Sequence, residues 1–137
     1  MRAPSSTLDE LLQSAGHELA ACARGVVPYE RGVRGFDPAA RNLLDIAAVP
    51  LVRMRTNLPI LVDPSHGVGV RAAIPAMALV AIAVGADGLM LERHPDAGLA
   101  RSDGPQALSL EAMRRRFEGV RAVAAAIAPA RSAFAAE

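Results

Sequence analysis

The segment Leu58-Pro59-Ile60-Leu61-Val62-Asp63-Pro64-Ser65-His66 joins an apolar run to a polar loop. The apolar part, Leu58–Val62, is typical of a buried β-strand. Asp63 and His66 follow at the carboxyl end of this strand. In parallel α/β sheets and barrels, catalytic and binding residues gather at that edge. Asp63 and His66 are therefore the first candidates for a functional site.

Two further candidate strands end in the same way. Gly25–Tyr29 leads into the polar, glycine-bearing segment Glu30–Phe36, and Leu89–Glu92 leads into Arg93 and His94. Each polar cluster thus follows the carboxyl end of a strand. We expect helices around these strands at Ser5–Ala23, Asp37–Ala48, Val70–Val84 and Leu108–Ala128.

The order of these elements predicts a parallel α/β fold in a single domain, because one helix is followed by three β-α units. Asp37 is a candidate N-cap, with Pro38 at the first helical position. Pro50 is expected to interrupt that helix and to leave Val49–Arg55 irregular. The chain divides into a leading helix (residues 1–25), three β-α units (26–128) and a frayed tail (129–137).

Composition excludes several classes of function. The chain has 137 residues, is 52% hydrophobic and carries a net charge of +1, so it is globular and lacks the charge of a nucleic-acid binder. Its 15 basic residues are all arginine, and no lysine is present to form a Schiff base. The single cysteine, Cys22, cannot form an intrachain disulfide, which is compatible with the cytoplasm. We expect neither a signal peptide nor a membrane span; the apolar stretch Ala72–Ala86 is too short to cross a bilayer.

Three side chains at the predicted strand edge could bind a divalent metal such as Mn²⁺, Fe²⁺ or Zn²⁺. They are His66, Glu92 and Asp103, with His94 as a further candidate. Such residues also occur on this edge as helix caps and satisfied polar contacts, so both interpretations stay open. Likewise, Arg31 and Arg34 could clamp a phosphate or carboxylate, or belong to a solvated loop.

Several motifs resemble one enzyme family in order and approximate spacing. The chain is similar to the C-terminal half of 3-deoxy-7-phosphoheptulonate (DAHP) synthase, of the sub-type related to 3-deoxy-octulosonate 8-phosphate synthase. The first two motifs, Glu30–Phe36 and Arg41–Pro50, favour the heptulosonate enzyme over its octulosonate relative. The remaining matching segments are Leu61–His66, Ala81–Gly88, Glu92–Pro95 and Ser102–Gly104.

The resemblance implies a (β/α)₈ TIM barrel, of which this chain would supply strands six to eight and helices five to eight. It also implies condensation of phosphoenolpyruvate with erythrose 4-phosphate, the first step of the shikimate pathway that leads to aromatic amino acids. The family binds a divalent metal (Mn²⁺, Fe²⁺, Zn²⁺ or Co²⁺) through a Cys, a His, a Glu and an Asp. His66, Glu92 and Asp103 occupy three of these places.

The other implied roles concern the two substrates. Arg31 lies where the family contacts the phosphate of phosphoenolpyruvate, and Arg34 would assist it. Asp63 lies near the sugar-phosphate end of the site and joins His66 as a catalytic residue. The absence of lysine is consistent with this reaction, because the enol phosphate is itself the carbon nucleophile and no imine is required.

The chain also departs from the family. It has about half the residues of a whole barrel, and Cys22 does not match the metal-binding cysteine, whose strand is absent. Pro28, Tyr29, Gly35, Leu43 and Arg93 replace residues usual in the family. The expected partner is the missing N-terminal half-barrel or another copy of the chain. The alternative is a non-catalytic half-barrel that binds a partner or a phosphorylated ligand.

Overall fold

The structure is a computed structural model that describes residues 1–134. Its centre is a parallel sheet in the order β1-β2-β3, in which Tyr29 pairs with Leu61 and Leu61 pairs with Gly88. The α/β class predicted from the sequence is confirmed. The elements are α1 (Leu8–Ala20), β1 (Tyr29–Glu30), α2 (Ala48–Arg55), β2 (Leu61–Val62), α3 (Pro64–Val68), α4 (Ile74–Ala83), β3 (Gly88–Leu89), the 3₁₀ helix η1 (Ala97–Leu99) and α5 (Leu110–Phe134).

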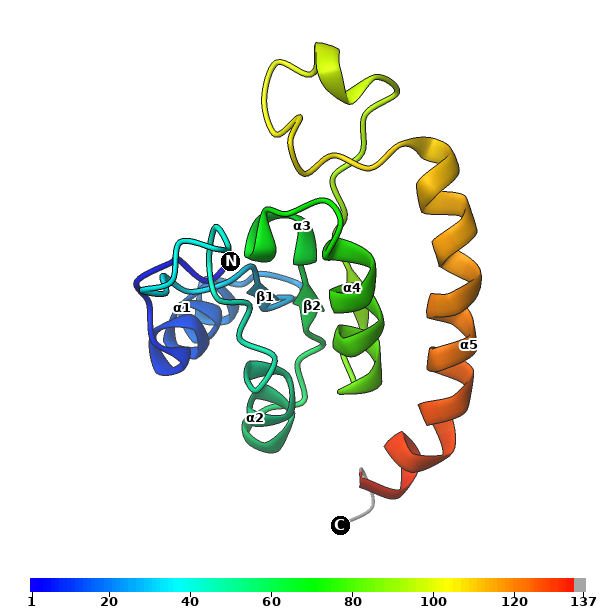
Figure 1. Ribbon diagram of the computed structural model, residues 1–137. Coiled ribbons are helices and arrows are strands. Elements are labelled where there is room, and N and C mark those ends of the chain that lie inside the picture. The colour runs from blue at the N-terminus through cyan, green and yellow to red at the C-terminus, as the bar shows by residue number, and fades with distance from the viewer. Residues whose placement is uncertain (135–137) are drawn as a thin grey trace.

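The core forms where β2 meets α2 and α4. Ile60 and Val62 of the central strand segment are fully buried against Val49 and Val52 of α2 and Ala81 of α4. Figure 1 shows α5 lying along α4 at the outside of the molecule, while the segment that contains η1 projects beyond α3. No helix within residues 1–134 is long and apolar enough to cross a membrane.

The prediction of a helix at Asp37–Ala48 is wrong. Residues 38–47 form turns, bends and one bridge at Leu43, and α2 begins only at Ala48. Hydrogen bonding within the loop after β1 outcompetes the helical signal, because Leu43 forms an antiparallel bridge with Val33 through backbone hydrogen bonds of 2.8 and 2.9 Å. The Asp37 carboxylate does accept from the backbone N–H of Ala39, but it closes only a local turn.

Three other predictions about the helices also differ from the structure. Pro50 does not interrupt a helix; it lies in the first turn of α2, where its missing N–H costs no helical hydrogen bond. The predicted helix at Val70–Val84 begins later, at Ile74, and is preceded by the separate helix α3. The tail predicted to fray is helical up to Phe134, since α5 continues through Pro129; residues 135–137 lie outside the described part of the chain.

The first helix is held at its start by a capping box. The Thr7 hydroxyl accepts from the backbone N–H of Glu10 at 3.2 Å, and the Glu10 carboxylate accepts from the backbone N–H of Thr7 at 2.7 Å. Replacing Thr7 with alanine should lower the free energy of unfolding by about 1 kcal/mol, as for other N-cap deletions. Urea denaturation followed by circular dichroism measures this loss. Thr7→Ser keeps the hydroxyl and should retain most of the stability; equal losses in both variants would contradict the capping role.

Candidate metal and anion site

The segment after β2 folds into a short capped helix. Asp63 is fully buried, and its Oδ1 accepts from the backbone N–H of His66 at 2.9 Å, as expected of an N-cap. Pro64 occupies the first helical position, and Gly69 ends the helix with a φ of 71°. These residues therefore turn a polar strand end into one helical turn that carries His66.

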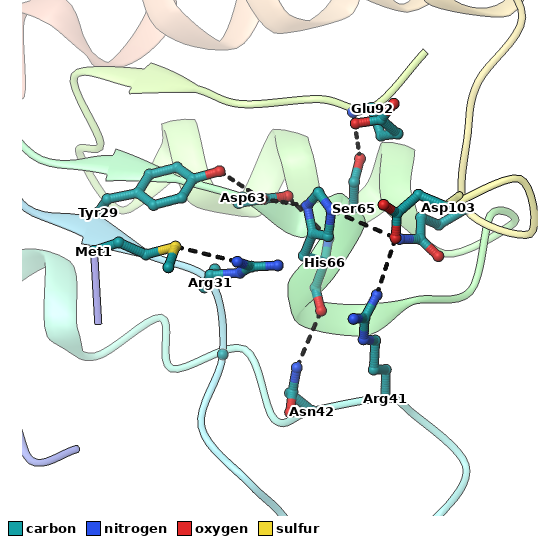
Figure 2. Close-up of polar contacts among 12 residues, drawn as sticks. Met1, Tyr29, Arg31, Arg41, Asn42, Asp63, Ser65, His66, Glu92 and Asp103 are labelled. Carbon is teal, nitrogen blue, oxygen red and sulfur yellow. Dashed lines mark hydrogen bonds and ion pairs between the residues drawn. The ribbon is translucent and has the colours of Figure 1, made fainter. Parts of the chain in front are cut away.

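The imidazole of His66 is oriented by the same carboxylate. His66 Nδ1 lies 2.6 Å from Asp63 Oδ2. Since an ionised carboxylate only accepts hydrogen bonds, we assign the ring proton to Nδ1, which leaves Nε2 with its lone pair. Nε2 lies 3.7 Å from Asp103 Oδ1, so His66 stands between two acidic side chains (Figure 2). A carboxylate behind an imidazole in this way is typical of histidines that bind metals.

Asp103 reaches His66 from the loop after β3. Its backbone is left-handed, with a φ of 58°. Its Oδ1 accepts from Gln106 Nε2 at 2.5 Å and from Arg41 Nη1 at 3.4 Å. Partial burial would raise the pKa of Asp103, but the hydrogen bonds from Gln106 and Arg41 and the nearby His66 outweigh it and hold the pKa below its usual value. Asp103 is therefore a carboxylate at neutral pH.

Glu92 is fixed through its backbone. Its N–H donates to the hydroxyl of the buried Ser65 at 2.9 Å, which ties the end of the β3 segment to α3. In residues 1–134, no group of three or more His, Cys, Asp or Glu side chains is close enough to hold a metal ion. His66 and Asp103 thus come together, whereas Glu92 does not complete a cluster with them. His94 Nδ1 accepts from the backbone N–H of Asp96 in a turn, and Cys22 is exposed after α1.

The two arginines of the loop after β1 differ in position. Arg31 is half-buried, and in Figure 2 its guanidinium extends towards His66. Arg31 Nη1 contacts the sulfur of Met1 at 3.1 Å. Arg34 is exposed, and its backbone N–H donates to Pro4. Arg31 is therefore the better placed of the two for an anion beside His66.

A buried ionic network supports this loop and was missed at the sequence level. Glu30 is fully buried; its Oε1 accepts from the backbone N–H of Gly32 at 2.7 Å, and its Oε2 accepts from Arg2 Nη1 at 3.0 Å. Arg2 Nη1 also contacts Asp45 Oδ2 at 2.6 Å. The only sequence signal was a glutamate directly at the end of a buried strand. Its partner lies 28 residues away, which no local pattern could indicate.

The loop after β1 is also attached to α3. The backbone N–H groups of Arg41 and Asn42 donate to Val68 and Gly67 at 2.9 and 3.0 Å. The Asn42 side chain donates to the backbone carbonyl of His66 at 3.1 Å (Figure 2). The loop after β1, which carries Arg31, and the helix that carries His66 are therefore joined by hydrogen bonds.

With this geometry in place, comparisons with known proteins identify the family. The profile of the DAHP synthetase I family matches residues 2–125. The chain belongs to this family. It is 41% identical over 122 residues to phospho-2-dehydro-3-deoxyheptonate aldolase from Thermotoga maritima, covering 89% of this chain and 36% of the relative. It is 34% identical over 109 residues to 2-dehydro-3-deoxyphosphooctonate aldolase from Legionella pneumophila, covering 71% of this chain and 38% of that protein.

Comparison with solved structures identifies the same family as comparison of sequences. The crystal structure of the Thermotoga DAHP synthase superposes with a TM-score of 0.89 at 40% identity, over 92% of this chain and 37% of that one. A truncated form of the Thermotoga enzyme gives the same TM-score and is covered to 48%. The resemblance seen in the motifs is confirmed. Because the chain spans 36% to 38% of these curated relatives, most of each relative has no counterpart here.

Proposed function

We propose that this chain is the C-terminal half of a metal-assisted DAHP synthase, which condenses phosphoenolpyruvate with erythrose 4-phosphate in the cytoplasm. In this proposal, β1, β2 and β3 are strands six to eight of a (β/α)₈ barrel. The observation that carries it is the arrangement of Asp63, His66 and Asp103 at the carboxyl edge of the sheet. That edge is where barrel enzymes place their chemistry.

The donor set suits a divalent cation. His66 offers Nε2, and Asp103 offers an ionised carboxylate 3.7 Å away. Imidazole and carboxylate donors together suit Mn²⁺, Fe²⁺, Zn²⁺ or Co²⁺. Glu92 would be the third donor, and the fourth would come from outside this chain. When bound, the cation would polarise the aldehyde of erythrose 4-phosphate.

The chain's own residues would hold and orient the substrates. Arg31 would bind the phosphate of phosphoenolpyruvate, assisted by Arg34, because a guanidinium pairs well with phosphate oxygens. Asp63 keeps His66 in one tautomer and one orientation. The enol carbon of phosphoenolpyruvate attacks the aldehyde, water adds to the adjacent carbon, and phosphate leaves. No step requires the lysine that the chain lacks.

A partner that supplies the rest of the barrel is part of this proposal. Within the described residues, the sheet ends at β1 and β3, and parallel sheets are normally covered and closed in barrels. A cavity of about 480 Å³ lies between α4, β3 and α5. Its apolar lining includes Leu79, Ile82, Leu89, Leu108 and Phe117. The missing half-barrel, or another copy of this chain, would cover these surfaces.

The decisive experiment mixes this chain with a separately produced N-terminal half of a family barrel. Phosphate release from phosphoenolpyruvate and erythrose 4-phosphate is then measured with and without a chelator. We expect activity that needs both halves and is lost on chelation, and a drop of at least about 100-fold in His66→Gln, since metal ligands are essential for Lewis-acid catalysis. Circular dichroism shows whether the variant keeps its fold. A folded, associated mixture that stays inactive, while the intact Thermotoga enzyme responds, would refute the proposal.

The second candidate is a half-barrel without catalysis that binds a phosphorylated ligand or a protein partner. It is favoured by the absence of a three-ligand cluster within residues 1–134. The same experiment separates the two functions. Binding of phosphoenolpyruvate through Arg31, measured by calorimetry, without phosphate release in the mixture would support the binding module.

A further inference from the structure

Tyr29 extends the Asp63–His66 pair by one residue. Its hydroxyl donates to Asp63 Oδ2 at 2.5 Å, the same oxygen that lies 2.6 Å from His66 Nδ1. Tyr29 lies on β1 and Asp63 directly follows β2, and the backbone N–H of Asp63 donates to Glu30 in the neighbouring strand. Sheet pairing therefore fixes the distance between the phenol and the carboxylate (Figure 2).

We propose that Tyr29 is a positioning residue that holds the Asp63 carboxylate, and through it the His66 imidazole, with Nε2 directed towards Asp103. This inference rests on the proposed metal-dependent function and assigns a role to a residue outside the proposed metal and substrate ligands. Tyr29 is not one of the site residues predicted from the sequence.

The Tyr29 hydroxyl restricts the orientation of the Asp63 carboxylate. Rotation of a carboxylate about its last torsion is broad, so each hydrogen bond that Asp63 accepts narrows the range of its plane. Asp63 Oδ1 is held by the backbone N–H of His66, and Oδ2 is shared by His66 Nδ1 and the Tyr29 hydroxyl. Because Asp63 is fully buried, water cannot replace a lost donor without entering the core.

The consequence is control over which ring nitrogen faces the site. A metal ligand must present a lone pair, and the hydrogen bond at the other nitrogen selects it. A fixed Asp63 keeps the proton on Nδ1 and the lone pair on Nε2. Partners behind metal ligands typically change metal affinity by about 10- to 100-fold.

Tyr29→Phe removes only the hydroxyl and tests the role in the full chain. The ring ¹⁵N shifts of His66, assigned by comparison with His66→Gln, report the tautomer without any metal. We expect one tautomer, protonated at Nδ1, in the unmodified chain and a mixture of tautomers in Tyr29→Phe. Calorimetry with Zn²⁺ should show about tenfold weaker binding in the variant. A folded Tyr29→Phe with unchanged ring shifts and unchanged Zn²⁺ affinity would overturn the inference.

A second measurement needs no variant of Tyr29. The chain has one tyrosine and no tryptophan, so its tyrosine emission belongs to Tyr29 alone. Zn²⁺ has a filled d shell and is redox-inert, so it does not quench tyrosine emission by electron transfer. A change in emission when Zn²⁺ is added would therefore report a change in the hydrogen bond between Tyr29 and Asp63. We expect saturating Zn²⁺ to change the emission in the unmodified chain and not in His66→Gln. Bound Zn²⁺ with unaltered emission would contradict the inference, whereas complete failure of Zn²⁺ to bind would contradict the proposed function and leave the tautomer measurement to decide the role of Tyr29.

Discussion

Replacing Arg2 with methionine should lower the free energy of unfolding by about 3–5 kcal/mol, the usual cost of breaking a buried ion pair from one side. The Arg2 side chain is 8% exposed and contacts Glu30, whose side chain is 0% exposed. The variant would leave the Glu30 carboxylate buried beside the Asp45 carboxylate without their shared cation. Urea denaturation followed by circular dichroism measures the loss.

A matched variant separates lost packing from lost charge. Arg2→Met combined with Glu30→Gln removes the uncompensated buried charge while keeping the volume of both side chains, and should recover at least about half of the lost stability. The amide oxygen of the glutamine can still accept from the backbone N–H of Gly32. If the double variant were as unstable as the sum of the two single variants, the ionic interpretation of this network would be wrong.

Replacing Gly32 with alanine should cost roughly 2–4 kcal/mol, from a strained backbone and an overpacked contact. Gly32 has a φ of 92°, a conformation that residues with a Cβ rarely adopt. An added Cβ would lie 2.7 Å from Asn42 Cβ and 3.1 Å from Gly67 Cα, so neighbouring backbone would have to move. The free energy of unfolding from urea denaturation, and phosphoenolpyruvate binding by calorimetry, should both fall.

Gly25→Ala is the control for that experiment. A Cβ at Gly25 would meet nothing within 4 Å. Its stability should therefore change by about 0.5 kcal/mol or less, as for most substitutions away from tight contacts. A loss at Gly25 as large as the loss at Gly32 would show that the contact between the loops does not determine the effect.

The sequence predicted those elements whose signals are local. The apolar run before Asp63 and the polar residues after it identified the central strand and the edge that carries His66. The strand predicted at Gly25–Tyr29 ends one residue later, at Glu30, and the strand predicted at Leu89–Glu92 ends three residues earlier, at Leu89, because β-pairing and not composition sets where a short strand stops. The motifs of Glu30–Phe36 and Ser102–Gly104 identified the family from the sequence alone. The order of motifs along the chain can be compared with a family even where the local secondary structure is predicted wrongly.

The failures have a common physical cause. Residues 38–47 have a helical pattern, yet the backbone N–H groups of residues 41–43 donate to α3 and to Val33 and not to a preceding helical turn. Likewise, the Tyr29 hydroxyl donates to a residue 34 positions away, and the Arg2 guanidinium donates to one 28 positions away. Tertiary partners override local propensity in such segments, and a single sequence carries no record of them.

The attachment of the loop after β1 to α3 constrains how this protein could be engineered. Asn42 binds the carbonyl of His66, and Gly32 lies against both Asn42 and Gly67. A loop transplanted from a relative into residues 31–44 would meet a mismatched surface unless residues 63–69 came from the same donor. Chimeras at this edge should therefore exchange the two segments as one cassette.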